Sequence, residues 1–301
     1  MKKVLITGAT GATGGNAIKQ LLELKVPVRA LVHKVDERSE KLSAQGVEIV
    51  QGDLTDFEAV NEALQGITTA YFVFPVRVPG VLEATAVFAQ AAIEQRLGAI
   101  VNMSQISARR IAKSHAAQNH WIAERLLDRS GIPVTHLRPT FFAEWLMYLS
   151  ESIREKDRFP LPFADARYAP IAAEDQGRVI AAILHNPAEH AGKTYPLYGP
   201  KELTQYEIAD ILTQVLGRKI TYLPVEIEAF SKLWEEQGYS PYIRQHISAV
   251  AQDCRDGVFS GTNDLVEKLT GQKPMPMLDY IAKNKAAFAR QQADSPEARP
   301  R

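Results

Sequence analysis

A set of three glycines near the N-terminus constrains the fold of this chain more than any other feature. Residues 4–7, Val-Leu-Ile-Thr, predict a short buried strand. Gly8, Gly11 and Gly14 follow, and residues 16–24 then carry apolar side chains at helical spacing. Strand, glycine turn and helix in this order are typical of a dinucleotide-binding unit. The spacing Gly-x-x-Gly-x-x-Gly differs from the commoner Gly-x-Gly-x-x-Gly.

Each glycine has a physical role in such a unit. Gly8 permits a turn too tight for a Cβ atom, Gly11 lets a diphosphate approach the backbone, and Gly14 lets the helix pack close to the strand. Free N–H groups at the helix N-terminus then face the phosphates. A purely structural turn is the alternative. The residues predicted to bind the cofactor here are Gly8, Thr10, Gly11, Ala12, Thr13 and Gly14.

Apolar strands and helices alternate over the first 139 residues. Further strands are predicted at residues 26–32, 47–50, 69–74, 99–103 and 133–138. The segments between them have helical patterns and short links, with Thr55 or Asp56 capping one helix and Ser114 near the start of another. Strands that are apolar on both faces indicate a parallel sheet covered on both sides. The predicted fold class is therefore α/β, a doubly wound parallel sheet.

The pattern becomes irregular after residue 140. We expect an amphipathic helix starting over residues 141–149, an irregular Pro-rich segment at 158–163, short strands at 193–198 and 219–223, and helices up to about residue 290. The predicted domains are a dinucleotide-binding domain at 1–140 and a smaller α+β substrate-binding lobe at 141–290. An alternative is that the lobe and the sheet exchange a strand or a helix. Residues 291–301 are predicted to form a flexible tail.

Composition excludes several function classes. Lys plus Arg and Asp plus Glu both number 35, so no overall charge attracts nucleic acid or an anionic membrane. We expect the Arg109-Arg110 pair to be solvated. The single cysteine excludes an intrachain disulfide and fits a reducing compartment. With no signal peptide and no apolar run near ~18 residues, a cytoplasmic protein with no nucleic-acid or membrane partner is predicted.

The end of the second predicted strand bears on the choice of dinucleotide. A site for NAD places an acidic residue there, whereas this chain has His33, Lys34 and Arg38 and no acid before Asp36. A basic cluster suits the 2′-phosphate of NADP(H), with NAD(H) as the alternative cofactor. The alternative is that these residues are solvated surface charges with no role in binding.

Residues at the ends of later strands are expected to follow the cofactor along the sheet. Asp53 and Leu54 should lie near the adenine, where Asp53 either accepts from the exocyclic amine or caps a helix. Pro139 and two pairs of residues, Phe74 with Pro75 and Met103 with Ser104, should flank the ribose and nicotinamide. Phe141, Phe142 and Trp145 are predicted to line the acceptor pocket, although ordinary core positions suit them equally.

Several motifs together resemble the NmrA-like branch of the atypical short-chain dehydrogenases. They are residues 6–14, 28–32, 52–54, 130–139, 171–178 and 198–204. The resemblance reaches about residue 225. It implies a Rossmann domain, a small C-terminal substrate lobe and a preference for NADP(H). Members of this branch include quinone reductases, triphenylmethane-dye and azo-dye reductases, isoflavone-reductase-type enzymes and non-catalytic regulators that sense NADP.

The chain departs from ordinary short-chain dehydrogenases at their catalytic acid. None of its ten tyrosines is followed by Lys four positions later. By the resemblance, His120 stands where many relatives carry Lys, and Ala116 stands at the tyrosine position. General acid catalysis is worth about 10²–10⁴ in rate, so simple ketone reduction should be slow. Quinones and cationic dyes depend less on such an acid.

His120 and Ser104 are the candidate catalytic residues. The His120 imidazole is predicted to bind the nicotinamide ribose or to donate a proton, and a packed helix histidine is the alternative. Ser104 is predicted to hydrogen-bond the carboxamide or the substrate, with a strand-end cap as its alternative. No metal site is expected. Trp234 and Tyr239 are guesses for residues that close the pocket.

Two functions from different classes follow. The first is an NADPH-dependent oxidoreductase that transfers hydride to a conjugated small-molecule acceptor, quinone-like or dye-like, without a Tyr-Lys acid. The second is a non-catalytic NADP(H)-sensing regulator of the NmrA type. With either function, a homodimer or a regulatory protein partner is an alternative to a monomer acting alone. The missing Tyr-Lys pair favours the second function, while an apolar pocket at the nicotinamide would favour the first.

Overall fold

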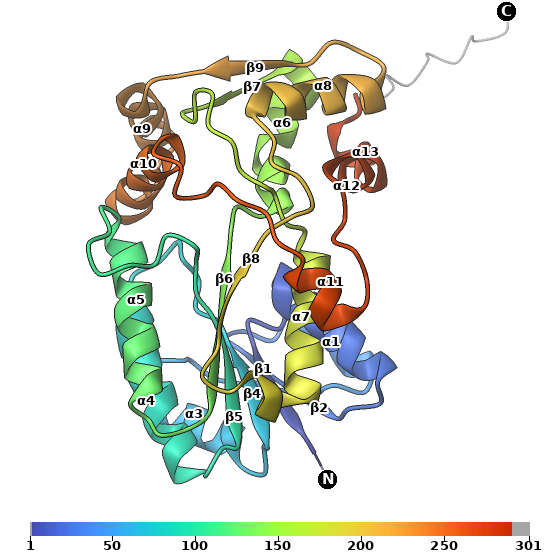
Figure 1. Ribbon diagram of the computed structural model, residues 1–301. Helices are drawn as coiled ribbons and strands as arrows, with labels where there is room; N and C mark the ends of the chain where they lie inside the picture. Colours follow the sequence, from blue (N-terminus) through green and yellow to red (C-terminus); the bar gives the residue numbers. More distant parts are fainter. Residues whose placement is uncertain (1, 291–301) are drawn as a thin grey trace, which may run out of the picture.

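The computed structural model describes residues 2–290 of the chain, so the predicted tail at 291–301 lies outside the described residues. Its main element is a seven-stranded parallel sheet of order β3-β2-β1-β4-β5-β6-β8 (Figure 1). The prediction of a doubly wound α/β fold is confirmed. The strands are β1 (Val4–Thr7), β2 (Val28–Val32), β3 (Glu48–Gln51), β4 (Thr69–Phe72), β5 (Ala99–Met103), β6 (Val134–Pro139) and β8 (Thr194–Leu197).

Helices cover both faces of this sheet. One face packs against α1 (Ala12–Glu23), α7 (Ala173–His185) and α11 (Leu265–Thr270). The other packs against α3 (Phe57–Leu64), α4 (Val81–Glu94) and α5 (His115–Asp128), while α2 (Glu37–Ala44) leads from β2 to β3. Side chains alternate between these two cores. The strands therefore bury both faces, which explains their continuous apolar sequences.

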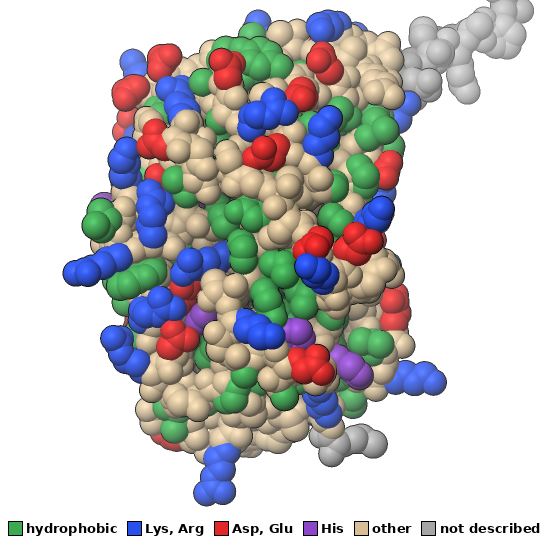
Figure 2. Space-filling view, viewed as in Figure 1, with side chains coloured by type: hydrophobic (Ala, Val, Ile, Leu, Met, Phe, Trp, Pro, Cys, Tyr) green, Lys and Arg blue, Asp and Glu red, His purple; other side chains and the backbone are tan. Residues whose placement is uncertain are grey.

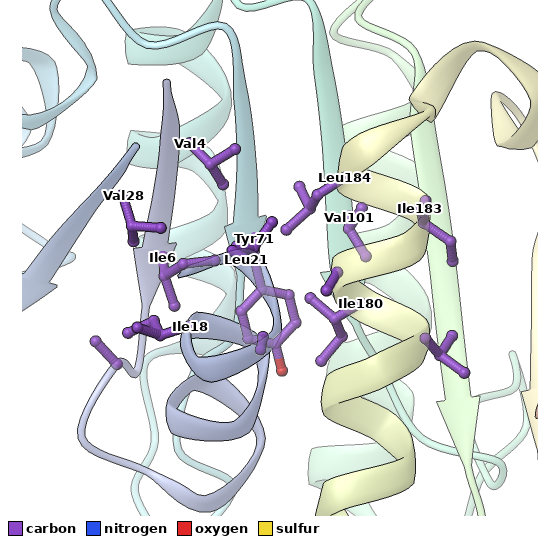
Figure 3. Packing of buried hydrophobic residues seen from close by; sticks show 14 of the residues in the cluster. Val4, Ile6, Ile18, Leu21, Val28, Tyr71, Val101, Ile180, Ile183 and Leu184 are labelled. Atoms are coloured by element: carbon purple, nitrogen blue, oxygen red, sulfur yellow. The ribbon is translucent and has the colours of Figure 1, made fainter. Parts of the chain in front are cut away.

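Helices α1 and α7 pack side by side over one face of the sheet. Ile18 and Leu21 of α1 and Ile180 and Leu184 of α7 share one core with Ile6 of β1 (Figure 3). All five side chains are fully buried. Burial of each such side chain stabilises the fold by about 1.5–3 kcal/mol.

The strand order reverses where β1 lies between β2 and β4. At this point the Thr7 hydroxyl accepts a hydrogen bond from the Val73 amide at 2.8 Å and approaches the Val73 carbonyl oxygen at 3.2 Å. The two bonds hold the end of β1 beside the segment that follows β4. A reversal of this kind leaves a crevice outside the carboxyl ends of the strands, which is where ligands of such sheets bind.

The second half of the chain adds a lobe above these strand ends (Figure 1). A core of aromatic and aliphatic side chains holds the lobe together. Residues 173–185 and 194–197 also come from this half, yet they belong to the sheet and its helical layer. The division into two domains stays a prediction. The lobe elements are η1 (Ala143–Leu149), α6 (Ser150–Lys156), β7 (Arg158–Leu161), α8 (Gln205–Leu216), β9 (Thr221–Pro224), α9 (Ile227–Glu236), α10 (Pro241–Arg255), α12 (Met277–Lys283) and α13 (Lys285–Phe288), with the short η2 (Pro187–His190) beside β6.

Two expectations for the lobe were wrong. Residues 158–161 form a strand, β7, that pairs in parallel with β9, although an irregular segment was predicted from Pro160 and Pro162. Each strand of this pair has only one partner, so a proline can leave its outer side unbonded. Residues 141–142 are extended rather than helical, because Phe142 bridges to Ile171 and the Ala143 amide donates to the Ile171 carbonyl. The following η1 is a 3₁₀ helix.

Charge is mixed over the molecular surface. Figure 2 shows Lys and Arg interspersed with Asp and Glu on one face, consistent with the equal numbers of the two kinds of residue. Within residues 2–290, no helix has the length and apolar character needed to cross a membrane.

The crossing of α1 and α7 leaves no room for a methyl group at Gly177. A Cβ atom there would lie 2.4 Å from the Asn16 Cβ and 2.7 Å from the Asn16 carbonyl carbon. We expect Gly177→Ala to lower the free energy of unfolding by about 1–3 kcal/mol, since overpacking forces the backbones apart. Chemical denaturation followed by circular dichroism measures this.

Gly15→Ala is the matched control, because its Cβ would meet only the Ala9 carbonyl oxygen, at 3.5 Å. Alanine is the better helix former by up to about 1 kcal/mol, so this variant should be as stable as the parent or more so. Equal stability of Gly177→Ala and the parent protein would contradict the close crossing.

Candidate functional site

The glycine turn is built by close backbone contacts. Gly8 has a φ of +58°, and a Cβ atom on it would lie 2.5 Å from the Val73 Cγ1. A Cβ atom on Gly14 would lie 2.4 Å from the Gly8 carbonyl oxygen. A larger residue at Gly14 would push α1 away from the end of β1, and one at Gly8 would clash with Val73. Gly11 precedes α1 and supplies no side-chain cap, so the amides of the first helical turn lack that acceptor. Such a helix end suits an anion.

A hollow of about 340 Å³ lies against this turn, and we call it the loop hollow. Gly8, Gly11, Ala12 and Thr13 line one side of it, and residues 73 and 75–77 line another. The Thr13 hydroxyl is 2.9 Å from the Tyr71 hydroxyl, which ties the turn to β4. Thr10 and Gly14 do not line the hollow. Gly14 contributes indirectly, because its lack of a Cβ atom allows α1 to approach the backbone of Gly8.

A second hollow of about 230 Å³ lies at the carboxyl ends of β4, β5 and β6, and we call it the acceptor cavity. It adjoins the loop hollow, because Val73, Pro75, Val76, Phe142 and Trp145 line both. The sequence-predicted residues that the structure brings together here are Phe74, Pro75, Met103, Ser104, His120, Pro139, Phe141, Phe142 and Trp145. Their roles in binding stay predictions.

An apolar extension leads from the acceptor cavity into the lobe. Phe141, Phe142, Trp145 and Ile247 line both spaces, and Phe230 and Trp234 of α9 line the extension alone. No Asp, Glu, Lys, Arg or His lies among the described residues that line the extension. Trp234 thus lies where a pocket wall was guessed, and Tyr239 stacks on it with ring centroids 4.3 Å apart.

The residues predicted for the adenosine end lie at the surface beyond β2 and β3. The Nε and Nη2 atoms of Arg38 both donate to one carboxylate oxygen of Asp36, Oδ2, at 3.0 and 2.6 Å. His33 is 3.3 Å from the Asp53 carboxylate, and Lys34 is exposed. Asp53 also accepts hydrogen bonds from the Thr55 amide and hydroxyl, whereas Asp56 is the residue that caps α3. Leu54 is partly buried against the core.

His120 is buried on α5 at the edge of the acceptor cavity. Burial lowers the pKa of His120 to about 4, while the carboxylate of Glu124, one turn further along, opposes the shift. The imidazole is therefore neutral at pH 7. Within residues 2–290 no hydrogen-bond partner fixes its tautomer. The Ser104 hydroxyl is also buried in the cavity lining without a partner there.

The structure adds His246 to this cavity, a residue that the sequence did not indicate. It lies on α10 and lines the acceptor cavity together with His120. Its Nδ1 is 2.7 Å from the hydroxyl of Ser114, the residue that caps α5. Burial and the nearby His120 lower the pKa of His246 to about 4. The two residues that meet are 132 positions apart, so no local motif could have revealed the contact.

A buried ion pair fixes α10 against the segment before α5. The Arg109 guanidinium donates to both carboxylate oxygens of Asp253, at 2.6 and 2.8 Å, and only 1% of Asp253 is exposed. The expectation that Arg109 is simply solvated was therefore wrong. Its partner lies 144 residues away, so sequence proximity gave no sign of it. Gln245 adds hydrogen bonds to the His115 amide and the Lys113 carbonyl.

The chain belongs to the NmrA-like family, whose family model matches residues 1–280. The predicted resemblance is thereby confirmed. Within the described residues, no group of three or more His, Cys, Asp or Glu is arranged to hold a metal ion.

Two relatives match nearly the whole chain. NAD(P)H azoreductase of Xenophilus azovorans is 27% identical over 95% of this chain and 99% of its own. Quinone oxidoreductase 2 of Escherichia coli is 28% identical over 93% of this chain and 97% of its own. The crystal structure of E. coli NADPH-dependent quinone oxidoreductase QOR2 complexed with NADPH matches with a TM-score of 0.84 at 24% identity, covering 94% and 99% of the chains.

The negative transcriptional regulator NmrA, solved in complex with NAD, shares the fold as well. Its TM-score is 0.79 at 17% identity, and the match covers 94% of each chain. A likeness at this identity shows the fold alone.

Two of the buried histidines, His120 and His246, make stability depend on pH, because burial lowers the pKa of each. The unfolded chain binds more protons than the folded chain between about pH 4 and 6.5. The contribution of these histidines to the free energy of unfolding is therefore complete above about pH 6.5 and is lost as the pH falls toward about 4. We expect His120→Asn to lose about 1–2 kcal/mol less stability than the parent between pH 7 and pH 5. Urea unfolding at both pH values measures the difference.

The control is His115→Asn, an exposed position on the same helix. It should lose as much stability as the parent over this range. A parallel loss in His120→Asn would mean that His120 titrates normally.

Proposed function

We propose that this protein is an NADPH-dependent oxidoreductase that transfers hydride to a conjugated acceptor, quinone-like or dye-like. One observation carries the proposal: the hollow at the glycine turn adjoins an apolar cavity at the carboxyl ends of the central strands. In a doubly wound sheet this crevice is the ligand site. The azoreductase and the quinone oxidoreductase to which the chain is similar are named for acceptors of this kind.

The residues present fit a dinucleotide. A Cβ atom on Gly8 or Gly14 would fill the backbone turn, and the uncapped first turn of α1 offers amides to a diphosphate. Pro75, Met103 and Ser104 would flank the nicotinamide, and the unpartnered Ser104 hydroxyl would hydrogen-bond its carboxamide or the acceptor. When bound, the reduced nicotinamide supplies a hydride. Lys34 and Arg38 are proposed for the 2′-phosphate of NADP(H).

The acceptor class follows from the lining of the cavity. Aromatic side chains surround it, and both of its histidines are neutral at pH 7, so a flat apolar molecule replaces water there at little cost. The absence of a Tyr-x-x-x-Lys pair limits acceptors that need a strong acid. For a quinone or dye, orientation and exclusion of water contribute most. Phe141, Phe142 and Trp145 would hold its ring.

The regulator remains the alternative, and it requires binding without turnover. We expect the purified protein to oxidise NADPH in the presence of a naphthoquinone or a neutral azo dye, well above the protein-free rate. The decrease in nicotinamide absorbance measures this. Tight NADPH binding with no acceptor reduced would favour the regulator.

Two neighbouring glycines provide the controls for this assay. Gly14→Ala should abolish NADPH binding and turnover, because its Cβ would meet the Gly8 carbonyl oxygen at 2.4 Å. Gly15→Ala should retain both, since its Cβ has room.

Cofactor choice is tested at the surface beyond β2. We expect Lys34→Ala and Arg38→Ala to weaken NADPH binding by about tenfold each, the loss of one charge-assisted contact, and to leave NADH within about twofold. Calorimetric titration gives both Kd values.

Lys41→Ala is the control, because Lys41 pairs with Glu37 on the same helix, α2, and lies further from the strand end. Equal weakening of NADPH and NADH by the Lys34 and Arg38 variants would refute the phosphate assignment.

A further inference from the structure

We infer that His246 is a catalytic residue that donates a hydrogen bond from its Nε2–H to the acceptor atom on which negative charge develops. This inference rests on the proposed function. It assigns to the C-terminal lobe the donor that the missing tyrosine would otherwise supply.

The hydrogen bonds of Ser114 define the tautomer of His246. The Ala117 amide donates to the Ser114 hydroxyl oxygen at 3.1 Å, as in an ordinary helix cap. The hydroxyl hydrogen then needs an acceptor, and the one nitrogen within reach is the His246 Nδ1, at 2.7 Å. Ser114 is fully buried, so water does not compete for this hydrogen. Nδ1 is thus the acceptor, and the neutral ring carries its proton on Nε2.

The position of His246 is fixed by the docking of α10. The buried Arg109–Asp253 pair holds one part of this helix, and the side chain of Gln245, next to His246, bonds to the backbone before α5. The His246 ring lines the acceptor cavity, which Ser104 and His120 line as well. A donor held in place before the substrate arrives need not be reoriented during the reaction.

His120 lacks the same constraint. No partner within the described residues fixes its tautomer, whereas His246 has the Ser114 hydroxyl. Ser114 is accordingly a positioning residue. With Nδ1 bonded to the Ser114 hydroxyl, the opposite ring nitrogen, Nε2, is left without a partner among the described residues and is available to the cavity that the ring lines.

The chemistry requires such a donor for some acceptors and not for others. Hydride transfer from NADPH to a quinone breaks a C–H bond of the nicotinamide, forms a bond to the quinone and leaves a hydroquinone anion. Water then supplies the proton that completes the hydroquinone. Hydride transfer to a cationic triarylmethane dye gives a neutral product and leaves no anion. A donor in a water-poor cavity speeds the first reaction and has little effect on the second.

The experiment compares these two acceptors in the parent protein, His246→Leu and His246→Gln. We expect His246→Leu to lower kcat for a naphthoquinone by about 10–100-fold, the range found for loss of one such donor, and to change kcat for the cationic dye less than threefold. His246→Gln keeps an N–H near the position of Nε2 and should recover part of the quinone activity. The NADPH Kd should stay constant in all three proteins. His115→Leu, on the exposed side of α5, is the control.

A merely structural role would lower turnover of both acceptors alike, and that result, or no change with either, would overturn the inference. If the parent protein reduces no acceptor, the proposed function fails instead. Nitrogen-15 NMR of the folded protein separates the two cases without turnover. The signals that His246→Leu removes should show a protonated Nε2 and a bare Nδ1, and Ser114→Ala should shift them. A proton on Nδ1 would overturn the inference, including when the parent protein reduces only one of the two acceptors.

Discussion

The approach of backbone to backbone at the start of α1 is the constraint on which the rest of the structure depends. Gly14 meets the Gly8 carbonyl on one side of this helix, and Gly177 of α7 meets Asn16 on the other. Helix α1 is thereby held between the first strand and α7. Because close backbone contacts hold its N-terminus on both sides, the open amides of the first turn point toward a defined place. The loop hollow and the adjoining acceptor cavity inherit their geometry from that contact.

The acceptor cavity is assembled from both halves of the chain. Ser104 follows β5 and His120 lies on α5, whereas His246 comes from α10 of the lobe. Two neutral histidines, the hydroxyls of Ser104 and Thr140 and the amide of Gln105 make a cavity that can donate hydrogen bonds but carries no charge at pH 7. Uncharged donors discriminate less strongly against apolar acceptors than an ion would. Removing water from a neutral donor when the substrate enters costs less free energy than removing it from a charged group.

Much of the sheet and half of the site could be predicted from the sequence because they depend on local signals. Residues 99–103 were predicted to the residue, since an apolar run between helices has few alternatives. The glycine turn and the aromatics after β6 lie close to recognisable strand ends, whereas His120 was predicted from the family resemblance. In contrast, Arg109 and His246 acquire their roles from partners more than a hundred residues away. Strand β7 was missed because Pro160 obscures a strand that has only one partner.

The position of β8 has a consequence for how this protein is made. The ribosome delivers residues 194–197 only after the first part of the lobe, so the edge of β6 stays unpaired until then. The turn at residues 8–14 leaves the exit tunnel far earlier, and α10 and Phe259 follow last of the parts that form the acceptor cavity. A nascent chain thus acquires the glycine turn well before it acquires the histidine from α10. Synthesis from N- to C-terminus therefore completes the glycine turn first and the wall of the acceptor cavity afterwards.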